Sequence, residues 1–288
     1  MLHIKEDQPM NMSPSITALI CITLLSQTVT GQRLSNRDTR ETTQLLKRTV
    51  VKSVTHWEYK YKFGQPSETG TKLEVLTYDT LGNLCTKTSF RSSGKPSFSD
   101  TCRYDDLQRL LEVITYDETR TPRLILGKET YKYVDGKVDF IQYDKDGRVG
   151  QKKTFACDSL GYVVDEDLSK CESKRDKDGT VLESAYPSLA NPRHKITYKY
   201  DPARRLVELR RARFDISGYD TPTAETIYRY NQAGNQIEVE YLGGRYPTIT
   251  KESLKYNNDG LKLEILKYDG NGEPTELHKY TYEFFSRQ

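Results

Sequence analysis

Two acidic pairs come nearest to the spacing of a metal site. Asp144 and Asp146, and likewise Asp176 and Asp178, each stand in an Asp-Lys-Asp-Gly run, which is how a calcium-binding loop begins. The complete loop closes with a glutamate at its twelfth position, and no glutamate follows Asp144 at that spacing. Because aspartate and glycine are also ordinary turn residues, turn formation explains both runs without an ion. We therefore expect no metal and no cofactor.

The sequence contains no recognisable arrangement for catalysis. A nucleophile elbow, a phosphate-binding Gly-Lys-Ser/Thr loop and an H-E-x-x-H zinc motif are all missing from it. His56, His194 and His278 are far apart in the sequence, and we interpret them as surface or packing residues. A paired-carboxylate glycosidase is conceivable, but 41 acidic residues offer candidate pairs without any specificity. We predict that the protein is not an enzyme.

Four cysteines remain after a fifth, Cys21, is assigned to an N-terminal export segment. They permit two disulfides in any of three connectivities, and proximity in sequence suggests Cys85–Cys102 and Cys157–Cys171. The alternative is four half-buried thiols on strands. That alternative is strongest for Cys157, because it occupies a place where the repeat described below has tyrosine. No C-x-x-C pair exists, so no zinc cluster is expected.

An apolar run near the N-terminus predicts export. Ile16–Leu25 is too short for the roughly 20 residues that span a bilayer. Val29-Thr30-Gly31 then offers small residues where signal peptidase cleaves, which would leave Gln32 as the new N-terminus. A buried core segment is the competing interpretation. The position and length of the apolar run, and the small residues that follow it, favour a signal peptide over 1–31. We therefore expect a secreted, periplasmic or cell-envelope location and no transmembrane span in the mature chain.

Composition indicates a sheet with much solvent-facing area. The 288 residues include 21 tyrosines and 8 phenylalanines at a mean hydropathy of -0.77. Tyrosine combines an apolar ring with a polar tip and suits half-covered strands. The 44 basic and 41 acidic residues are interleaved and leave a net charge of only +3. Such a surface predicts no nucleic-acid partner.

One sequence motif repeats along the chain: a segment of alternating apolar and polar residues ends in an aromatic residue and Asp or Asn, followed by two residues and then Gly. Asp or Asn starts a type I turn, and the glycine supplies the positive φ that closes a hairpin. Gln108 and Arg204 stand at the glycine position of two degenerate copies. The clearest copies contain Tyr78, Asp79 and Gly82; Tyr143, Asp144 and Gly147; Tyr230, Asn231 and Gly234; and Tyr256, Asn257 and Gly260.

The flanking segments alternate with period two, as at Ile196, Tyr198 and Tyr200, and helical periodicity is weak and confined to about Thr42 to Val51. We therefore predict an all-β fold, an antiparallel meander of successive hairpins over 53–288, preceded by a loose leader over 32–52.

The repeated motif resembles the YD repeat of Rhs-type proteins. Tyr78–Leu84, Tyr104–Leu110 and Tyr143–Val149 match best, and the resemblance covers most of residues 53–288. It implies a long, curling antiparallel sheet, which in complete members closes into a shell around a toxic C-terminal domain or presents a surface for adhesion. This chain is shorter and has no Asp-Pro-x-Gly motif near Gln288. We expect a short, degenerate member without a toxin domain, whose sheet is open or only partly closed.

Pairs of tyrosines two residues apart, such as Tyr198/Tyr200 and Tyr280/Tyr282, point to one face of a strand. They could stack on sugar rings or a peptide, but cross-strand stabilisation of the sheet is the favoured interpretation. We predict a non-enzymatic binding or structural module with a protein or glycan ligand. The alternative is a component of an Rhs-type toxin system, or a carbohydrate-active enzyme that uses the sheet as a scaffold. Unpaired sheet edges also suggest self-association.

Overall fold

A computed structural model of the chain describes residues 36–157, 163–165, 172–177, 180–186, 193–214, 220–243 and 250–286. The predicted signal peptide and Cys171 lie outside these residues. In the described part of the chain, no helix has the length and apolar character needed to cross a membrane.

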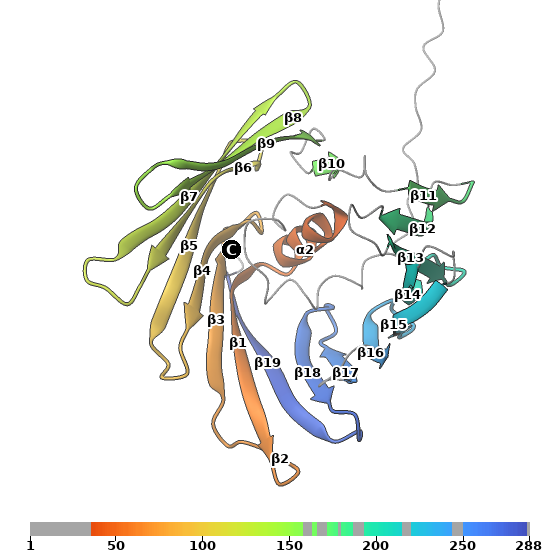
Figure 1. Cartoon of the computed structure of the whole chain (residues 1–288). Coiled ribbons are helices and arrows are strands. Elements are labelled where there is room, and N and C mark those ends of the chain that lie inside the picture. Colours follow the sequence, from red (N-terminus) through yellow and green to blue (C-terminus); the bar gives the residue numbers. More distant parts are fainter. Residues whose placement is uncertain are drawn as a thin grey trace, which may run out of the picture.

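Antiparallel strands account for nearly all regular structure, which confirms the all-β meander (Figure 1). The first half contains β1 (Val51–Lys62), β2 (Gln65–Pro66), β3 (Thr71–Tyr78), β4 (Leu84–Phe90), β5 (Pro96–Tyr104), β6 (Leu110–Asp117), β7 (Leu124–Val134), β8 (Lys137–Asp144), β9 (Val149–Cys157) and β10 (Val163–Asp165). The second half contains β11 (Glu172–Arg175), β12 (Val181–Tyr186), β13 (Arg193–Tyr200), β14 (Leu206–Phe214), β15 (Asp220–Tyr230), β16 (Gln236–Gly243), β17 (Lys251–Tyr256), β18 (Lys262–Tyr268) and β19 (Pro274–Phe284).

The first strand, β1, lies in the middle of the sheet rather than at an edge. It pairs with β3 on one side and with the last strand, β19, on the other. From β3 the chain meanders outward to β9 and β10, and from β11 it meanders back to β19. The two edges of the sheet are therefore β10 and β11, which follow each other in sequence.

This topology requires the sheet to curl. Only six residues separate Asp165 at the end of β10 from Glu172 at the start of β11, and a chain of that length reaches at most about 25 Å. At about 4.8 Å between neighbouring strands, the eighteen strands that lie side by side, all but β2, would hold the edges of a flat sheet about 80 Å apart. Figure 1 shows the resulting arc. In the described residues β10 pairs only with β9 and β11 only with β12, so the sheet is not closed there.

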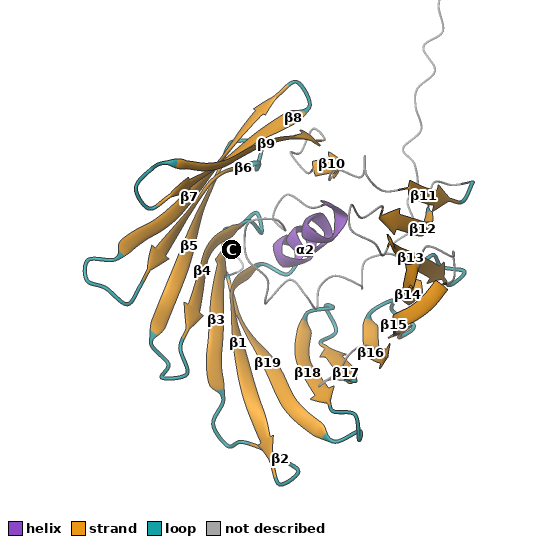
Figure 2. Cartoon of the chain, in the orientation of Figure 1, coloured by secondary structure: helices purple, strands orange, loops and turns teal. Residues whose placement is uncertain are grey.

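A helix, α2 (Asn36–Arg48), lies inside the arc, on what we call the concave face of the sheet (Figure 2). We expected a loose leader over 32–52, and the structure differs from that expectation. The segment is polar, yet Leu45 and Leu46 stand together on one side of it and pack against the sheet. The basic residues Lys47 and Arg48 in the last turn complement the helix dipole.

The main core forms between α2 and the concave face. Leu46 is 6% exposed and belongs to one cluster with apolar residues of β1, β3 and β14 to β19. A second, smaller cluster without helical residues lies on β6 to β9 around Val113, Tyr131 and Phe140. The helix therefore packs against the middle of the sheet and the arm formed by β14 to β19.

Candidate functional site

The repeat turns share one hydrogen-bonded geometry. In the turn at Asp79 the amide of Gly82 donates to the carbonyl of Asp79 at 3.1 Å, and the amide of Asp79 donates to the carbonyl of Asn83 at 3.0 Å. The carboxylate of Asp79 also accepts from the amide of Asn83, four residues on, at 2.8 Å. The same contact to the fourth residue recurs at 2.8–3.0 Å in the turns that begin at Asp105, Asp144, Asp176, Asp201, Asn231, Asn257 and Asp269.

The glycine of the repeat has the conformation that the sequence predicted. Gly82, Gly147, Gly234 and Gly260 have φ values of 81°, 77°, 87° and 87°. In two degenerate copies a residue with a side chain adopts the same left-handed conformation, with φ of 62° at Gln108 and 60° at Arg204. The repeat geometry therefore persists where the sequence departs from glycine, at some cost in backbone strain.

Tyrosine hydroxyls connect each of four hairpins to the next. Each donates to the carbonyl oxygen that lies six residues after the turn tyrosine of the preceding copy, on the neighbouring strand. The four contacts run from Tyr104 to Leu84 at 3.1 Å, from Tyr133 to Leu110 at 3.0 Å, from Tyr230 to Leu206 at 2.7 Å and from Tyr282 to Lys262 at 2.6 Å. Burial raises the pKa of the turn tyrosines Tyr78 and Tyr230, which keeps these hydroxyls protonated.

Two arginines extend this ladder from turn to turn. Arg205 donates to the Asp201 carboxylate at 2.6 Å, and its guanidinium lies 4.9 Å from the ring centre of Tyr230. Arg109 makes the matching contacts with Asp105 in its own turn and with the ring of Tyr133. The turn residues predicted from the repeat are thus engaged in holding neighbouring hairpins together.

The acidic pairs act as turn residues. Asp144 accepts backbone amides from Asp146 at 2.9 Å and from Arg148 at 2.9 Å. The carboxylate of Asp146 contacts Lys145 at 3.2 Å. Asp178 lies outside the described residues.

The cysteines differ from the predicted disulfide pattern. The antiparallel register that pairs Thr86 with Thr101 places Cys85 of β4 opposite Cys102 of β5, but both are thiols. Burial, reinforced by the charge of Asp79, raises the pKa of the Cys85 thiol. Cys157 is buried in the second core cluster, and its predicted partner lies outside the described residues. The predicted Cys85–Cys102 disulfide is therefore not formed in this structure, although the paired strands place the two residues opposite each other.

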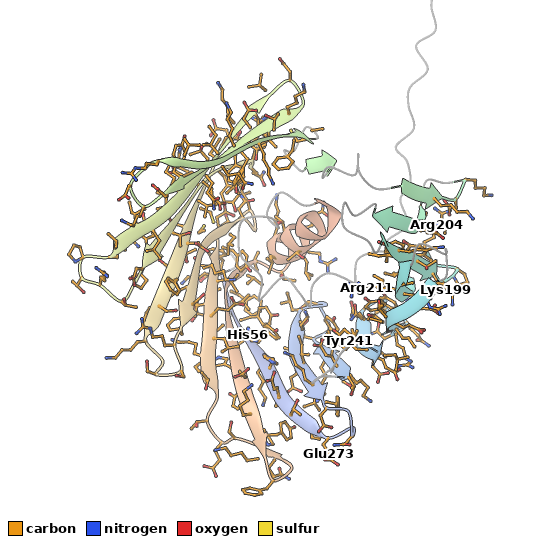
Figure 3. All side chains as sticks on the ribbon, viewed as in Figure 1. His56, Lys199, Arg204, Arg211, Tyr241 and Glu273 are labelled. Atoms are coloured by element: carbon orange, nitrogen blue, oxygen red, sulfur yellow. The ribbon has the colours of Figure 1, made fainter. Side chains whose placement is uncertain are left out.

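The histidines are where the structure corrects the sequence most. We interpreted His56 and His278 as surface or packing residues far apart in the sequence. Both are buried, and Nε2 of His56 lies 2.8 Å from Nδ1 of His278, although 222 residues separate them. The pairing of β1 with β19 brings them together. Both are 6% exposed, and the ring of His56 stacks on Tyr280, a member of the main core. Figure 3 shows His56 on the concave side of the arc.

Carboxylates lie at both ends of this histidine pair. Nδ1 of His56 lies 3.5 Å from Oε1 of Glu74, and Nε2 of His278 lies 3.2 Å from Oε2 of Glu276. The resulting row, Glu74–His56–His278–Glu276, crosses β3, β1 and β19. Lysines flank it: Lys87 contacts Oε2 of Glu74 at 3.1 Å. At the other end Lys60 and Lys267 contact Glu276, and Lys60 also contacts Glu58 at 3.2 Å.

Burial and charge set the protonation of this row. Burial would raise the pKa of Glu276, but the hydrogen bonds from Lys60 and His278 and the charge of Lys267 outweigh it and lower the pKa to about 2. Burial lowers the pKa of His278 to about 4, and the charge of Lys267 acts in the same direction. At neutral pH the row therefore contains an ionised carboxylate beside a neutral imidazole. Such a buried, polar, titratable row is a candidate functional site.

Two further buried polar residues lie on β16 and β17. Gln236 is 0% exposed, and neither its amide nitrogen nor its amide oxygen has a hydrogen-bond partner. Glu252 is 5% exposed, and burial raises the pKa of its carboxyl group, although Lys267 and Lys262 oppose the shift. Sequence reasoning missed both, because a Gln after a turn and a Glu in an alternating strand look like surface residues.

Comparisons with known proteins give only distant likenesses. No family model matches the sequence, and no curated protein matches it. A chain of the Photorhabdus luminescens Tc holotoxin pore is 14% identical over 74% of this chain, with a TM-score of 0.20, and a chain of TcdB2-TccC3 is 13% identical over 79%, with a TM-score of 0.25. The chain spans 14% of the length of each.

A porin-like protein from Bacteroides vulgatus is 12% identical, with 82% of this chain and 100% of that chain covered and a TM-score of 0.27. Likeness at this level does not extend to function.

Proposed function

We propose that this chain is an exported, non-enzymatic module of YD-repeat type, which works in the cell envelope or outside the cell by holding a polypeptide segment on the concave face of its curled sheet. The observation that carries the proposal is the position of α2. Its Leu46 side chain is 6% exposed in a core formed with β1, β3 and β14 to β19, so the concave face already binds one helical segment of the same chain.

The turn end of the sheet supports this binding. The backbone carbonyl of Thr43 lies so near Gly82 that a Cβ atom there would be 2.6 Å from it. At the C-terminal end of α2, Arg48 donates to the carbonyl of Asp259 at 3.2 Å. Two repeat turns that are far apart in sequence therefore contact one helix. These turns share the role of positioning α2 on the concave face of the sheet.

The predicted export signal and the absence of a catalytic motif from the sequence complete the proposal. Export is tested by recovering the full chain from cells that express it. We expect mature protein beginning at Gln32 in the envelope or the medium, and protein that retains Met1 in the cytoplasm would contradict export.

Binding on the concave face is tested by displacing α2. Leu46→Asp places a charge among buried apolar side chains, which is strongly unfavourable, so we expect the helix to leave while the sheet persists. A labelled peptide of residues 36–50 should then bind this variant and not the unmodified chain. Gln44→Asp adds the same charge at an exposed position of the helix and serves as the control.

Fluorescence anisotropy measures the binding, and circular dichroism checks that the β content is retained. If the peptide fails to bind the Leu46→Asp variant while its sheet remains folded, the concave face is not a polypeptide-binding surface.

A further inference from the structure

We propose that Glu58, Glu276 and His278 form a binding site for a divalent transition-metal ion, for which Zn²⁺ is the best match, with Lys60 occupying the position of the metal charge in the metal-free protein. The site goes beyond the proposed binding module and does not depend on it.

The ligand atoms are close enough for a single ion. One carboxylate oxygen from each glutamate and a ring nitrogen of His278 all lie within 4.8 Å of one another. In one of the pairs, Nε2 of His278 lies 3.2 Å from Oε2 of Glu276. Bonds of about 2.0–2.2 Å to zinc place neighbouring tetrahedral ligands at about this separation. Glu58 and His278 are register partners on β1 and β19, so the paired backbones fix the spacing of these two ligands.

If both imidazoles are neutral, the row has one hydrogen fewer than its contacts need. Three contacts, Glu74 to His56, His56 to His278 and His278 to Glu276, each need a hydrogen between the two atoms. Two neutral imidazoles supply only two N–H groups. If His278 donates to Glu276, then His56 donates to His278 and has no hydrogen for Glu74. The structure agrees with this arrangement, because Oε1 of Glu74 is buried without a hydrogen-bond partner.

A metal ion at Nε2 of His278 resolves that shortage. The proton of His278 then lies on Nδ1 and is donated to Nε2 of His56, whose own proton lies on Nδ1 and is donated to Glu74. Both protons stay within the row, so none is released. This gives the arrangement that fixes metal-binding histidines in proteins, in which the second ring nitrogen donates to an outer partner that ends in a carboxylate.

Lys60 explains how the site is stable without metal and how an ion enters. Its ammonium group contacts both Glu58 and Glu276, while its side chain is 55% exposed. A half-exposed lysine can move into solvent at little cost, since exposed ion pairs contribute little. Lys267, whose side chain is 21% exposed, lies 3.3 Å from Oε2 of Glu276 and has to turn away from that oxygen when it binds an ion. Glu58 and Glu276 are 20% and 21% exposed at the side chain, so the carboxylates are reachable from outside the core.

The donor set selects the class of metal. One imidazole and two carboxylates suit zinc and neighbouring transition metals. Calcium prefers six to eight oxygen ligands and magnesium retains several waters, so neither matches three protein ligands of which one is nitrogen.

The test is calorimetric titration of ZnCl₂ into the full mature chain after treatment with a chelator, repeated with CaCl₂. We expect one zinc per chain and no calcium binding. Glu58→Gln should weaken zinc binding by more than about ten-fold, and His56→Gln, which alters only the outer partner, by about 10–100-fold. Lys60→Met should instead tighten zinc binding by about two- to five-fold, because a competing ion pair is removed.

Glu264→Gln is the matched control. Glu264, on β18 beside β19, is also a glutamate paired with a lysine, Lys255 of β17. It lies next to Ile265, which is buried in the core, and so it faces outward. Its zinc affinity should be unchanged. Absorption bands of bound Co²⁺ should appear in the unmodified chain and be lost in Glu58→Gln. The proposal is overturned if zinc does not bind, or if Glu58→Gln and Glu264→Gln bind zinc equally.

Discussion

Two turn glycines separate the role of the repeat turn from the role of the helix that lies against it. Gly82 and Gly147 occupy the same position of the repeat and have φ values of 81° and 77°. A Cβ atom added to Gly82 would lie 2.6 Å from the carbonyl oxygen of Thr43 and 3.0 Å from the amide nitrogen of Lys47, both in α2. A Cβ atom added to Gly147 would have no neighbour within 4 Å.

The expected magnitudes follow from this difference. An alanine in the left-handed conformation costs about 1–2 kcal/mol, so Gly147→Ala should lower the free energy of unfolding by that amount. Gly82→Ala adds an overlap with helix backbone, and overpacking typically costs about 1–3 kcal/mol. The total for Gly82→Ala is therefore about 2–5 kcal/mol, roughly twice the effect of the control.

Urea denaturation followed by circular dichroism measures both free energies. Hydrogen exchange adds a readout specific to the helix: amides of residues 42–48 should lose protection in Gly82→Ala and keep it in Gly147→Ala. Equal losses of stability in the two variants, with unchanged protection of α2, would refute the close packing of the helix on this turn.

Three other variants test the buried polar residues and the strained turns. Gln236→Leu should raise the free energy of unfolding by about 1–3 kcal/mol, because two buried polar atoms without partners are removed. Leu206→Gln, at the equivalent repeat position, should lower the free energy of unfolding by a similar amount. A destabilised Gln236→Leu variant would show that the amide of Gln236 has hydrogen-bond partners. The pKa of Glu252 is higher in the folded than in the unfolded chain, so the folded state binds more protons and the free energy of unfolding falls as pH rises from about 4.5 through the raised pKa. Glu252→Gln should abolish that fall, measured by urea titrations at acidic and neutral pH. Glu264→Gln should leave the fall in place. Gln108→Gly should raise the melting temperature by relieving a positive φ worth about 1 kcal/mol, and Gln108→Ala should give no such gain.

Sequence alone determined the local structure of this protein. The turn at Asp79, the positive φ at Gly82 and the alternation of the flanking strands follow from interactions among residues within about five positions of one another. Such interactions depend little on the rest of the chain, so a repeated sequence motif predicted repeated hairpins. Closeness in sequence also suggested that Cys85 and Cys102 are partners; the pairing of β4 with β5 places them opposite each other, but the predicted disulfide is not formed.

Only the tertiary structure decided what lies on the concave face. The position of β1 between β3 and β19 is a long-range pairing, and it alone brings His56 to His278 and Glu58 to Glu276. The helical state of Asn36–Arg48 depends on the apolar surface that covers Leu46, because a short isolated helix is marginal in water. Neither effect has a local pattern, since each arises from contacts between segments that meet only after the sheet has curled.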